Sequence, residues 1–244
     1  MITAWSHSRL VVYEQCPFHL KLKYIDKIPE PIRPLPSGKK EHANERGTRI
    51  HEAAELFVLG GVELIPELGH FAEELHQLRD LYEKGTVSLE GDWGFNYDWE
   101  PVGWTSEDIW GRVKLDAFVQ PDPEAAIIID YKSGKKYGNE IKHGEQGQLY
   151  MLAAFMKYPE IKEVTVEFWY TDQNDMTRML YKESMLGRYK SKWEKRINAM
   201  LSDTKFEPRP NVYSCKWCPY KPAPEGSGDC PHGILHSVAR RDLS

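Results

Sequence analysis

Long apolar runs are missing from this sequence of 244 residues. A membrane-spanning helix needs about 18 or more consecutive apolar residues, and no stretch of that length occurs. Residues 1–7 also lack the basic and apolar regions of a secretory signal. We therefore expect a cytoplasmic protein that has no membrane partner.

The sequence also lacks an excess of basic residues, since its formal net charge is −5. Proteins that hold DNA persistently usually carry an overall basic excess. A nuclease is not excluded, because its site needs carboxylates and its bound divalent ions supply positive charge. The net charge therefore permits a nuclease without favouring one.

Cysteines are scarce, and their four positions are Cys16, Cys215, Cys218 and Cys230. In a cytoplasmic chain, a Cys-x-x-Cys motif indicates a metal site rather than a disulfide. Tetrahedral Zn²⁺ and a [4Fe–4S] cluster both fit four cysteines, and spacing alone favours zinc. His232 or His236 could replace one of the zinc ligands. Either group would join the first helix to the last loop and stabilise both chain ends.

Hydrophobic periodicity predicts an α/β fold with a helical N-terminal part. The predicted helices cover residues 7–25 (interrupted at Pro17), 42–59, 67–83, 143–157 and 184–202. The predicted strands cover residues 93–99, 109–119, 125–131, 163–171 and 176–182. Ile127–Ile129 is apolar on both faces, so we expect this strand in the centre of the sheet.

Aromatic residues alternate with small or polar ones at positions 93–99. This pattern predicts a half-buried strand whose aromatic face lies in the core. The alternative is a surface on which unpaired bases stack.

Two carboxylates and a lysine fall on neighbouring predicted strands. Asp116 lies in the middle of one strand, and Asp130 and Lys132 close the next. Because side chains alternate along a strand, Asp130 and Lys132 project from one face. Two carboxylates there would provide the hard oxygen ligands that Mg²⁺ or Mn²⁺ prefers. Taken alone, an Asp-x-Lys tripeptide is more often a salt bridge at a sheet edge.

Two helical pairs accompany these residues. His51 and Glu55 are one turn apart on the second predicted helix, and Gln146 and Tyr150 are one turn apart on the helix after Lys132. Taken alone, His51 is more often a capped or half-buried histidine than a ligand. Gln146 and Tyr150 alone are usually a polar surface residue beside a core aromatic residue.

Taken in order, the motifs resemble those of the RecB-like branch of the PD-(D/E)XK nucleases, which includes AddB, CRISPR-associated RecB-like proteins and phage exonucleases. They are Gly47-Thr-Arg-Ile-His51, Asp116, Asp130-Tyr-Lys132 and Gln146-Gly-Gln-Leu-Tyr150. The resemblance extends from about residue 6 to residue 232. It implies a central mixed β-sheet flanked by helices, the restriction-endonuclease-like core.

The resemblance also implies roles for individual residues. The metal ligands that it implies are His51, Asp116, Asp130 and the backbone carbonyl of Tyr131. Lys132 would orient or activate the attacking water and offset charge on the phosphate. Gln146 and Tyr150 would support Lys132 or contact the DNA backbone, and Glu55 is a weaker candidate.

The same resemblance changes the prediction for the cysteines. Cys16 followed by Cys215, Cys218 and Cys230 resembles the iron–sulfur motif of AddB and its relatives, and zinc remains the alternative. The implied division is a helical part at residues 1–85, which carries Cys16 and His51, and a nuclease core at 86–204. A Cys-rich segment at 205–244 would pack back on the N-terminal helix.

The function implied by the resemblance is a metal-dependent DNA exonuclease in recombination, repair or phage DNA processing. Its partners would be linear DNA ends, single- or double-stranded, and a recombination or helicase protein. Any helicase motor would be a separate chain, because no phosphate-binding P-loop motif occurs. The alternatives are a catalytically silent DNA-binding or scaffold module of the same fold, and a structure-specific or restriction-type endonuclease.

Overall fold

The computed structural model describes residues 2–235 and divides the chain into two compact units. The first unit is Leu35–Trp193, and the second combines Met1–Pro34 with Glu194–Ser244. In this division residues 35–85 group with the sheet, whereas the sequence-based division placed them with the N-terminal part. Every residue of the Asp130–Lys132 region and of its helical partners belongs to the first unit.

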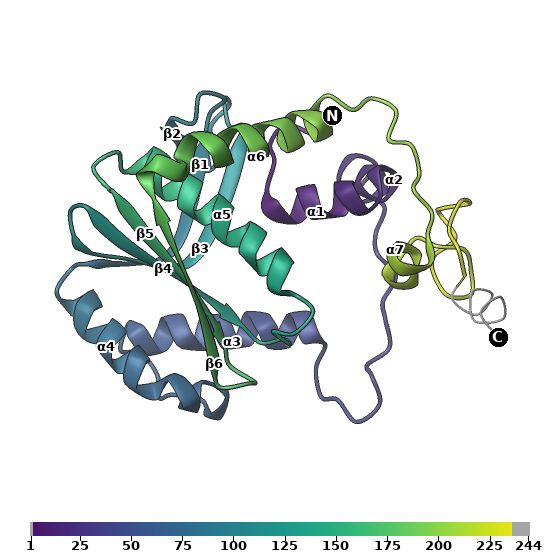
Figure 1. Cartoon of the computed structure of the whole chain (residues 1–244). Coiled ribbons are helices and arrows are strands. Elements are labelled where there is room, and N and C mark those ends of the chain that lie inside the picture. The colour runs from purple at the N-terminus through teal and green to yellow at the C-terminus, as the bar shows by residue number, and fades with distance from the viewer. Residues whose placement is uncertain (1, 236–244) are drawn as a thin grey trace. The chain divides into compact units, whose positions relative to one another are not determined.

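The first unit is built on a six-stranded mixed sheet (Figure 1). Its strands are β1 (Val87–Phe95), β2 (Pro101–Val102), β3 (Gly111–Asp122), β4 (Ala125–Lys132), β5 (Glu163–Tyr170) and β6 (Asp175–Lys182). Their order across the sheet is β2-β1-β3-β4-β5-β6. β4 and β5 are parallel and the other neighbours are antiparallel. The predicted α/β class and the central position of β4 are confirmed.

Helices cover both faces of this sheet (Figure 1). They are α3 (Ala43–Val58), the 3₁₀ turn Pro66–Phe71, α4 (Ala72–Glu83), α5 (Glu140–Lys157), the 3₁₀ turn Glu183–Met185 and α6 (Leu186–Leu201), which continues past Trp193. α3 and α4 pack on one face, where Ile50 and Leu75 join a core that includes Ile129 of the sheet. α5 is the crossover between β4 and β5, and its Tyr150 stacks against Phe168.

The predicted strand at residues 93–99 is correct only at its start. β1 covers Val87–Phe95, and the chain then turns at Asn96, whose side-chain oxygen accepts the N–H groups of Asp98 and Glu100. Trp99 is fully buried but has a left-handed φ of 65°, so its place in the alternating pattern comes from a turn. Trp93 packs edge-on against Phe118, which supports the core interpretation of its side chain.

The second unit contains α1 (His7–Gln15), α2 (Pro17–Leu20), a π-helical turn (Lys21–Ile25) and α7 (Val212–Trp217). The expected break at Pro17 is present, because Cys16 is extended and Pro17 begins the next helix. α7 was not predicted, since six residues are too short for a periodic pattern. Among the residues that the structure describes, no helix has the length and apolar character needed to cross a bilayer.

Candidate active site

The candidate site lies where strands β3 and β4 separate. Their backbone ladder reaches the pair Ala117↔Ile129, whereas β4 goes on pairing with β5 as far as Lys132↔Tyr170. Beyond Ile129, the N–H of Tyr131 donates to Asp116 Oδ2 at 2.8 Å. A carboxylate therefore replaces the backbone acceptor that a continuing β3 would have offered, and the catalytic candidates lie around this opening.

His51 joins this opening from helix α3. Its Nδ1 is 3.0 Å from Asp116 Oδ1, and its Nε2 is 2.8 Å from the carbonyl oxygen of Tyr131. Each ring nitrogen therefore lies within hydrogen-bond distance of an oxygen, and the tautomer decides which of the two nitrogens donates. Burial by itself lowers the pKa of His51, but the hydrogen bond and charge of Asp116 and the charge of Asp130 raise it above its ordinary value.

Gly47 and Arg46 bring the start of α3 close to the loop after β4. A Cβ atom on Gly47 would lie 3.3 Å from Ser133 Oγ, a close approach that the serine side chain would have to relieve by a small shift. Arg46 donates to the carbonyl of Ser133 at 3.0 Å and forms a bidentate pair with Asp172 at 2.6 and 3.0 Å. A small residue one helical turn before His51 therefore suits the close approach of α3 to this loop.

Asp130, Lys132, Gln146 and Tyr150 form a closed hydrogen-bond network. Lys132 Nζ is 2.7 Å from Asp130 Oδ1 and donates to Gln146 Oε1 at 2.9 Å. Gln146 Nε2 donates to the hydroxyl of Tyr150 at 2.5 Å, and that hydroxyl donates to Asp130 Oδ2 at 2.8 Å. The network holds the lysine ammonium at a fixed place beside a carboxylate that is only 2% exposed.

The electrostatics of the site suit a divalent cation. Burial raises the pKa of the Asp116 carboxyl, and the nearby charge of Asp130 raises it further. A cation between the two carboxylates would remove this repulsion, and their oxygens are the ligand type that Mg²⁺ and Mn²⁺ prefer. Within residues 2–235, no three His, Cys, Asp or Glu side chains already stand as a complete ligand set. The polar atoms of the site form hydrogen bonds with one another instead. The fit of the site to a divalent cation therefore rests on the chemical type of its ligand atoms.

A concave hollow opens over these groups, and four of its lining residues lie outside the predicted set. They are Thr48, Glu52, Glu90 and Lys114. Glu55, the weaker candidate, also lines the hollow, and its pKa is raised by burial and by the charge of Glu90. Lys114 pairs with Glu90 at 2.5 Å. Lys114 precedes Asp116 by two residues, so strand alternation gave a signal for it. Glu90 has a left-handed φ of 46°, and no sequence pattern revealed it.

The structure thus brings His51, Asp116, Asp130, Lys132, Gln146 and Tyr150 together in one hollow. The family model of the PD-(D/E)XK nuclease superfamily matches residues 4–223 of this chain. The chain belongs to the PD-(D/E)XK nuclease superfamily. Nucleases of this superfamily generally use Mg²⁺ or Mn²⁺, and the nuclease fold indicates a DNA substrate.

Solved structures of low sequence identity show weak similarity to this nuclease. SSO0001 is 14% identical, with 96% of this chain and 89% of that chain covered and a TM-score of 0.42. The alkaline exonuclease LHK-Exo from Laribacter hongkongensis, solved with dAMP, is 12% identical, with 82% and 87% covered and a TM-score of 0.34. A phage-related exonuclease from Haemophilus somnus 129PT is 12% identical, with 66% and 85% covered and a TM-score of 0.30. A search of curated proteins found no match. The family assignment rests on the family model alone.

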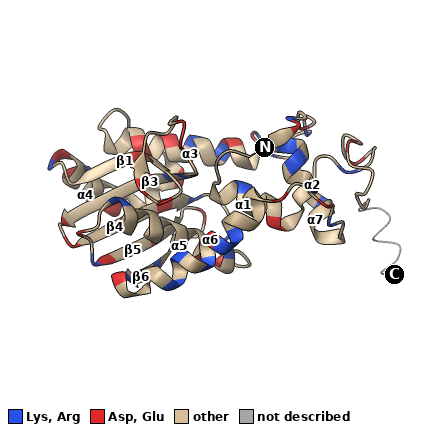
Figure 2. Ribbon diagram, turned by 90° about the horizontal axis from the view of Figure 1, so that it is seen from above, with Lys and Arg blue, Asp and Glu red and all other residues tan. Residues whose placement is uncertain are grey.

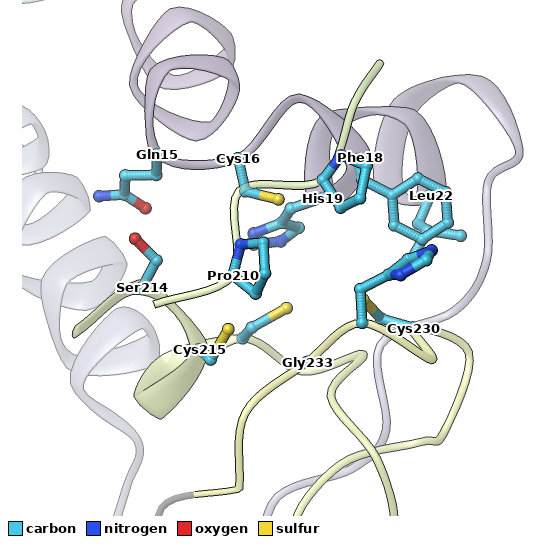
Figure 3. Close-up of a pocket in the computed structure, with 13 residues that line it drawn as sticks. Gln15, Cys16, Phe18, His19, Leu22, Pro210, Ser214, Cys215, Cys230 and Gly233 are labelled. Atoms are coloured by element: carbon cyan, nitrogen blue, oxygen red, sulfur yellow. The ribbon is translucent and has the colours of Figure 1, made fainter. Parts of the chain in front are cut away.

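The four cysteines of this nuclease line one pocket in the second unit. Side chains of Cys16, Cys215 and Cys230 point into it (Figure 3), and Cys218 is a further lining residue. All four thiols are free, and burial raises the pKa of Cys218 and of Cys230. His232 lines the same pocket, whereas His236 lies outside the described residues. Cysteines from both ends of the chain therefore line one pocket, but no three of the described Cys or His side chains there stand as a complete metal-ligand set.

Proposed function

We propose that this protein is a metal-dependent exonuclease that hydrolyses phosphodiester bonds at the ends of linear DNA. The observation that carries the proposal is the convergence of Asp116, Asp130 and Lys132 with His51 at the split between β3 and β4. The proposed setting is DNA recombination, repair or phage DNA processing, with a helicase or recombination protein as partner.

Each polar group of the site has a proposed task. His51, Asp116, Asp130 and the carbonyl of Tyr131 would hold Mg²⁺ or Mn²⁺, which when bound lowers the pKa of a water molecule and neutralises charge on the phosphate. Lys132 orients the attacking water and offsets the charge that develops on the phosphate. Gln146 and Tyr150 act as positioning residues, because their hydrogen bonds fix Lys132 and Asp130.

We further propose that Cys16, Cys215, Cys218 and Cys230 bind a [4Fe–4S] cluster, with structural Zn²⁺ as the alternative. The free thiols around one pocket support a thiolate site, since a disulfide would have paired them. Such a group would fix α1 and α2 against the C-terminal segment within the second unit.

Removal of divalent metal should abolish cleavage. Without a cation the carboxylates of Asp116 and Asp130 repel a phosphate, so we expect no hydrolysis in EDTA and full recovery when Mg²⁺ or Mn²⁺ is added in excess. Release of labelled nucleotides from linear DNA measures this directly. Full activity in a chelated, metal-free buffer would refute the assignment.

A free DNA end should be required. We expect end-labelled linear DNA to be degraded and covalently closed circles to be spared under the same conditions, since a nuclease that starts at ends finds none on a circle. The circle cut once by a restriction enzyme is the matched control. Rapid linearisation of intact circles would favour an endonuclease, and no cleavage of either form would favour the silent DNA-binding module.

A further inference from the structure

Two hollows meet at the candidate active site, and their charges differ. Both are lined by His51 and Lys132. The first is lined by five carboxylates, those of Glu52, Glu55, Glu90, Asp116 and Asp130. The second, which we call the acid-free hollow, is lined by His51, Tyr131, Lys132, Ser133, Gly134, Lys135, Asn139 and His143. None of these described lining residues is Asp or Glu, so Lys132 stands on the border between an acidic and a basic hollow.

Lys135 gives the acid-free hollow an uncommitted positive charge. Its side chain is exposed, and it forms no ion pair with any residue between 2 and 235. The neighbouring lysines differ, since Lys132 pairs with Asp130 at 2.7 Å and Lys136 pairs with Asp175 at 2.7 Å. An anion that enters this hollow can therefore pair with the Lys135 ammonium without breaking an existing ion pair.

His143 contributes a neutral donor to the same hollow. Its ring stacks on Phe168 with centroids 5.6 Å apart, and its Nδ1 lies 2.8 Å from the Tyr170 hydroxyl. Burial and the charge of Lys132 lower the pKa of His143 to about 4, so the ring is neutral at ordinary pH. When Tyr170 donates to Nδ1, the ring proton is on Nε2. Nε2 has no partner among the described residues and remains available as a donor.

We propose that the acid-free hollow binds a phosphate group of the substrate strand next to the phosphate that is hydrolysed. Lys135 and the Nε2–H of His143 are its side-chain donors, and the strand crosses Lys132 on its way between the two hollows. The phosphate is either an internal diester or the terminal phosphate of the strand. This inference rests on the proposed nuclease function and adds a positioning subsite to it.

Binding in EDTA isolates this subsite, because the acid-free hollow needs no cation whereas the acidic hollow does. The probes are fluorescent single-stranded oligonucleotides that each carry one neutral methylphosphonate, placed at successive positions from the end. Two further probes end in a phosphate or in a hydroxyl. The variants are Lys135→Ala, and His143→Phe, which keeps the aromatic stack. The control is Lys84→Ala, which removes another exposed lysine, one that follows α4 and forms no ion pair with any residue from 2 to 235.

We expect Lys135→Ala and His143→Phe each to lower affinity about three- to tenfold and Lys84→Ala to leave it unchanged. Lys135→Ala should also lower the slope of log K against log salt by about 1, as the loss of one phosphate contact does. One of the methylphosphonate probes should bind the wild type more weakly than the unmodified oligonucleotide does. The same probe should bind Lys135→Ala as well as the unmodified oligonucleotide does. If the subsite binds the terminal phosphate, the probe that ends in a hydroxyl should show the same loss of affinity for the wild type.

The subsite would be overturned if each methylphosphonate probe lost the same affinity for the wild type as for Lys135→Ala. Identical affinities of Lys135→Ala and Lys84→Ala would also overturn it. Cleavage by the wild type in Mn²⁺, measured on the same oligonucleotides, separates the two proposals. Cleavage with no Lys135 effect refutes the subsite alone, whereas no cleavage by the wild type of these oligonucleotides or of their duplexes refutes the nuclease function.

Discussion

Lys132→Met is expected to lower the rate of DNA hydrolysis by about a thousandfold or more. The network of Asp130, Gln146 and Tyr150 holds the Lys132 ammonium in place, whereas Lys114, the other lysine that lines the hollow, pairs with Glu90. The measurement is the initial rate of nucleotide release from linear DNA in Mn²⁺. Lys84→Met is the control for removal of a lysine from the same unit.

Loss of folding must be separated from loss of chemistry in this variant. Removal of the ammonium leaves the buried Asp130 carboxylate without its cation, which costs about 3–5 kcal/mol of stability. The double variant Asp130→Asn, Lys132→Met removes the unpaired charge as well, so we expect it to regain stability and to stay inactive. Near-normal turnover by folded Lys132→Met would show that the Asp-x-Lys assignment is wrong.

If the proposed thiolate site is correct, Cys16→Ser is expected to lower the melting temperature by about 10 °C or more and to prevent binding of the proposed cofactor. Cys16 lies between α1 and α2, about two hundred residues before the other three cysteines, so loss of this proposed ligand would free the N-terminal helices from the C-terminal segment. Gln15→Ala, at another residue that lines the pocket, is the matched control and should change neither property.

The identity of the cofactor follows from protein purified without oxygen. We expect a brown protein with broad absorbance near about 400 nm, as iron–thiolate charge transfer gives, and iron in the ratio of a [4Fe–4S] cluster. Colourless protein with stoichiometric zinc would refute the iron–sulfur proposal and retain the thiolate site. If the wild type contains neither iron nor zinc and Cys16→Ser has the same melting temperature as the wild type, both the iron–sulfur proposal and the thiolate site are refuted. Folded Cys16→Ser should still bind Mn²⁺ at Asp116 and Asp130, because those residues belong to the other unit.

The sequence was sufficient for the parts of the site that follow from local spacing. The i, i+2 relation of Asp130 and Lys132 and the i, i+4 relation of Gln146 and Tyr150 both hold, and these four residues form one network. The central strand β4 was predictable because its apolar run has no polar face. Local periodicity also predicted α3 and α5 to within three residues at either end.

Other features depend on sheet register and on non-helical backbone, which periodicity does not reveal. The separation of β3 from β4 beyond Ala117↔Ile129 leaves the Asp116 carboxylate to accept the N–H of Tyr131, and no pattern in either strand predicts where a ladder stops. Glu90 itself has a left-handed backbone conformation within β1 and lines the hollow. Trp99 lies in a turn and not in the strand that was expected there. His143 of α5 lines a hollow and has its ring beside the Tyr170 hydroxyl of β5, a contact between distant parts of the chain that local spacing does not reveal.

Charge is distributed in a way that explains why the net charge was uninformative. Lys and Arg are interspersed with Asp and Glu along α3 and gather on α6 (Figure 2). At the site itself, an acidic hollow and a hollow without Asp or Glu among its described lining residues share Lys132, so opposite charges cancel in the total. The local lining of a hollow, and not the sum over the chain, decides what the hollow binds.

The most direct test of the central claim compares the initial rate of DNA hydrolysis in Mn²⁺ for the wild type, Asp116→Asn and Asp80→Asn. Asn at position 116 keeps an oxygen for the N–H of Tyr131 but removes the charge that a cation requires. Asp80 is an exposed residue of α4 and controls for the same chemical change. We predict a loss of about a thousandfold or more for Asp116→Asn and none for Asp80→Asn. Wild-type hydrolysis by a folded Asp116→Asn variant would contradict the account.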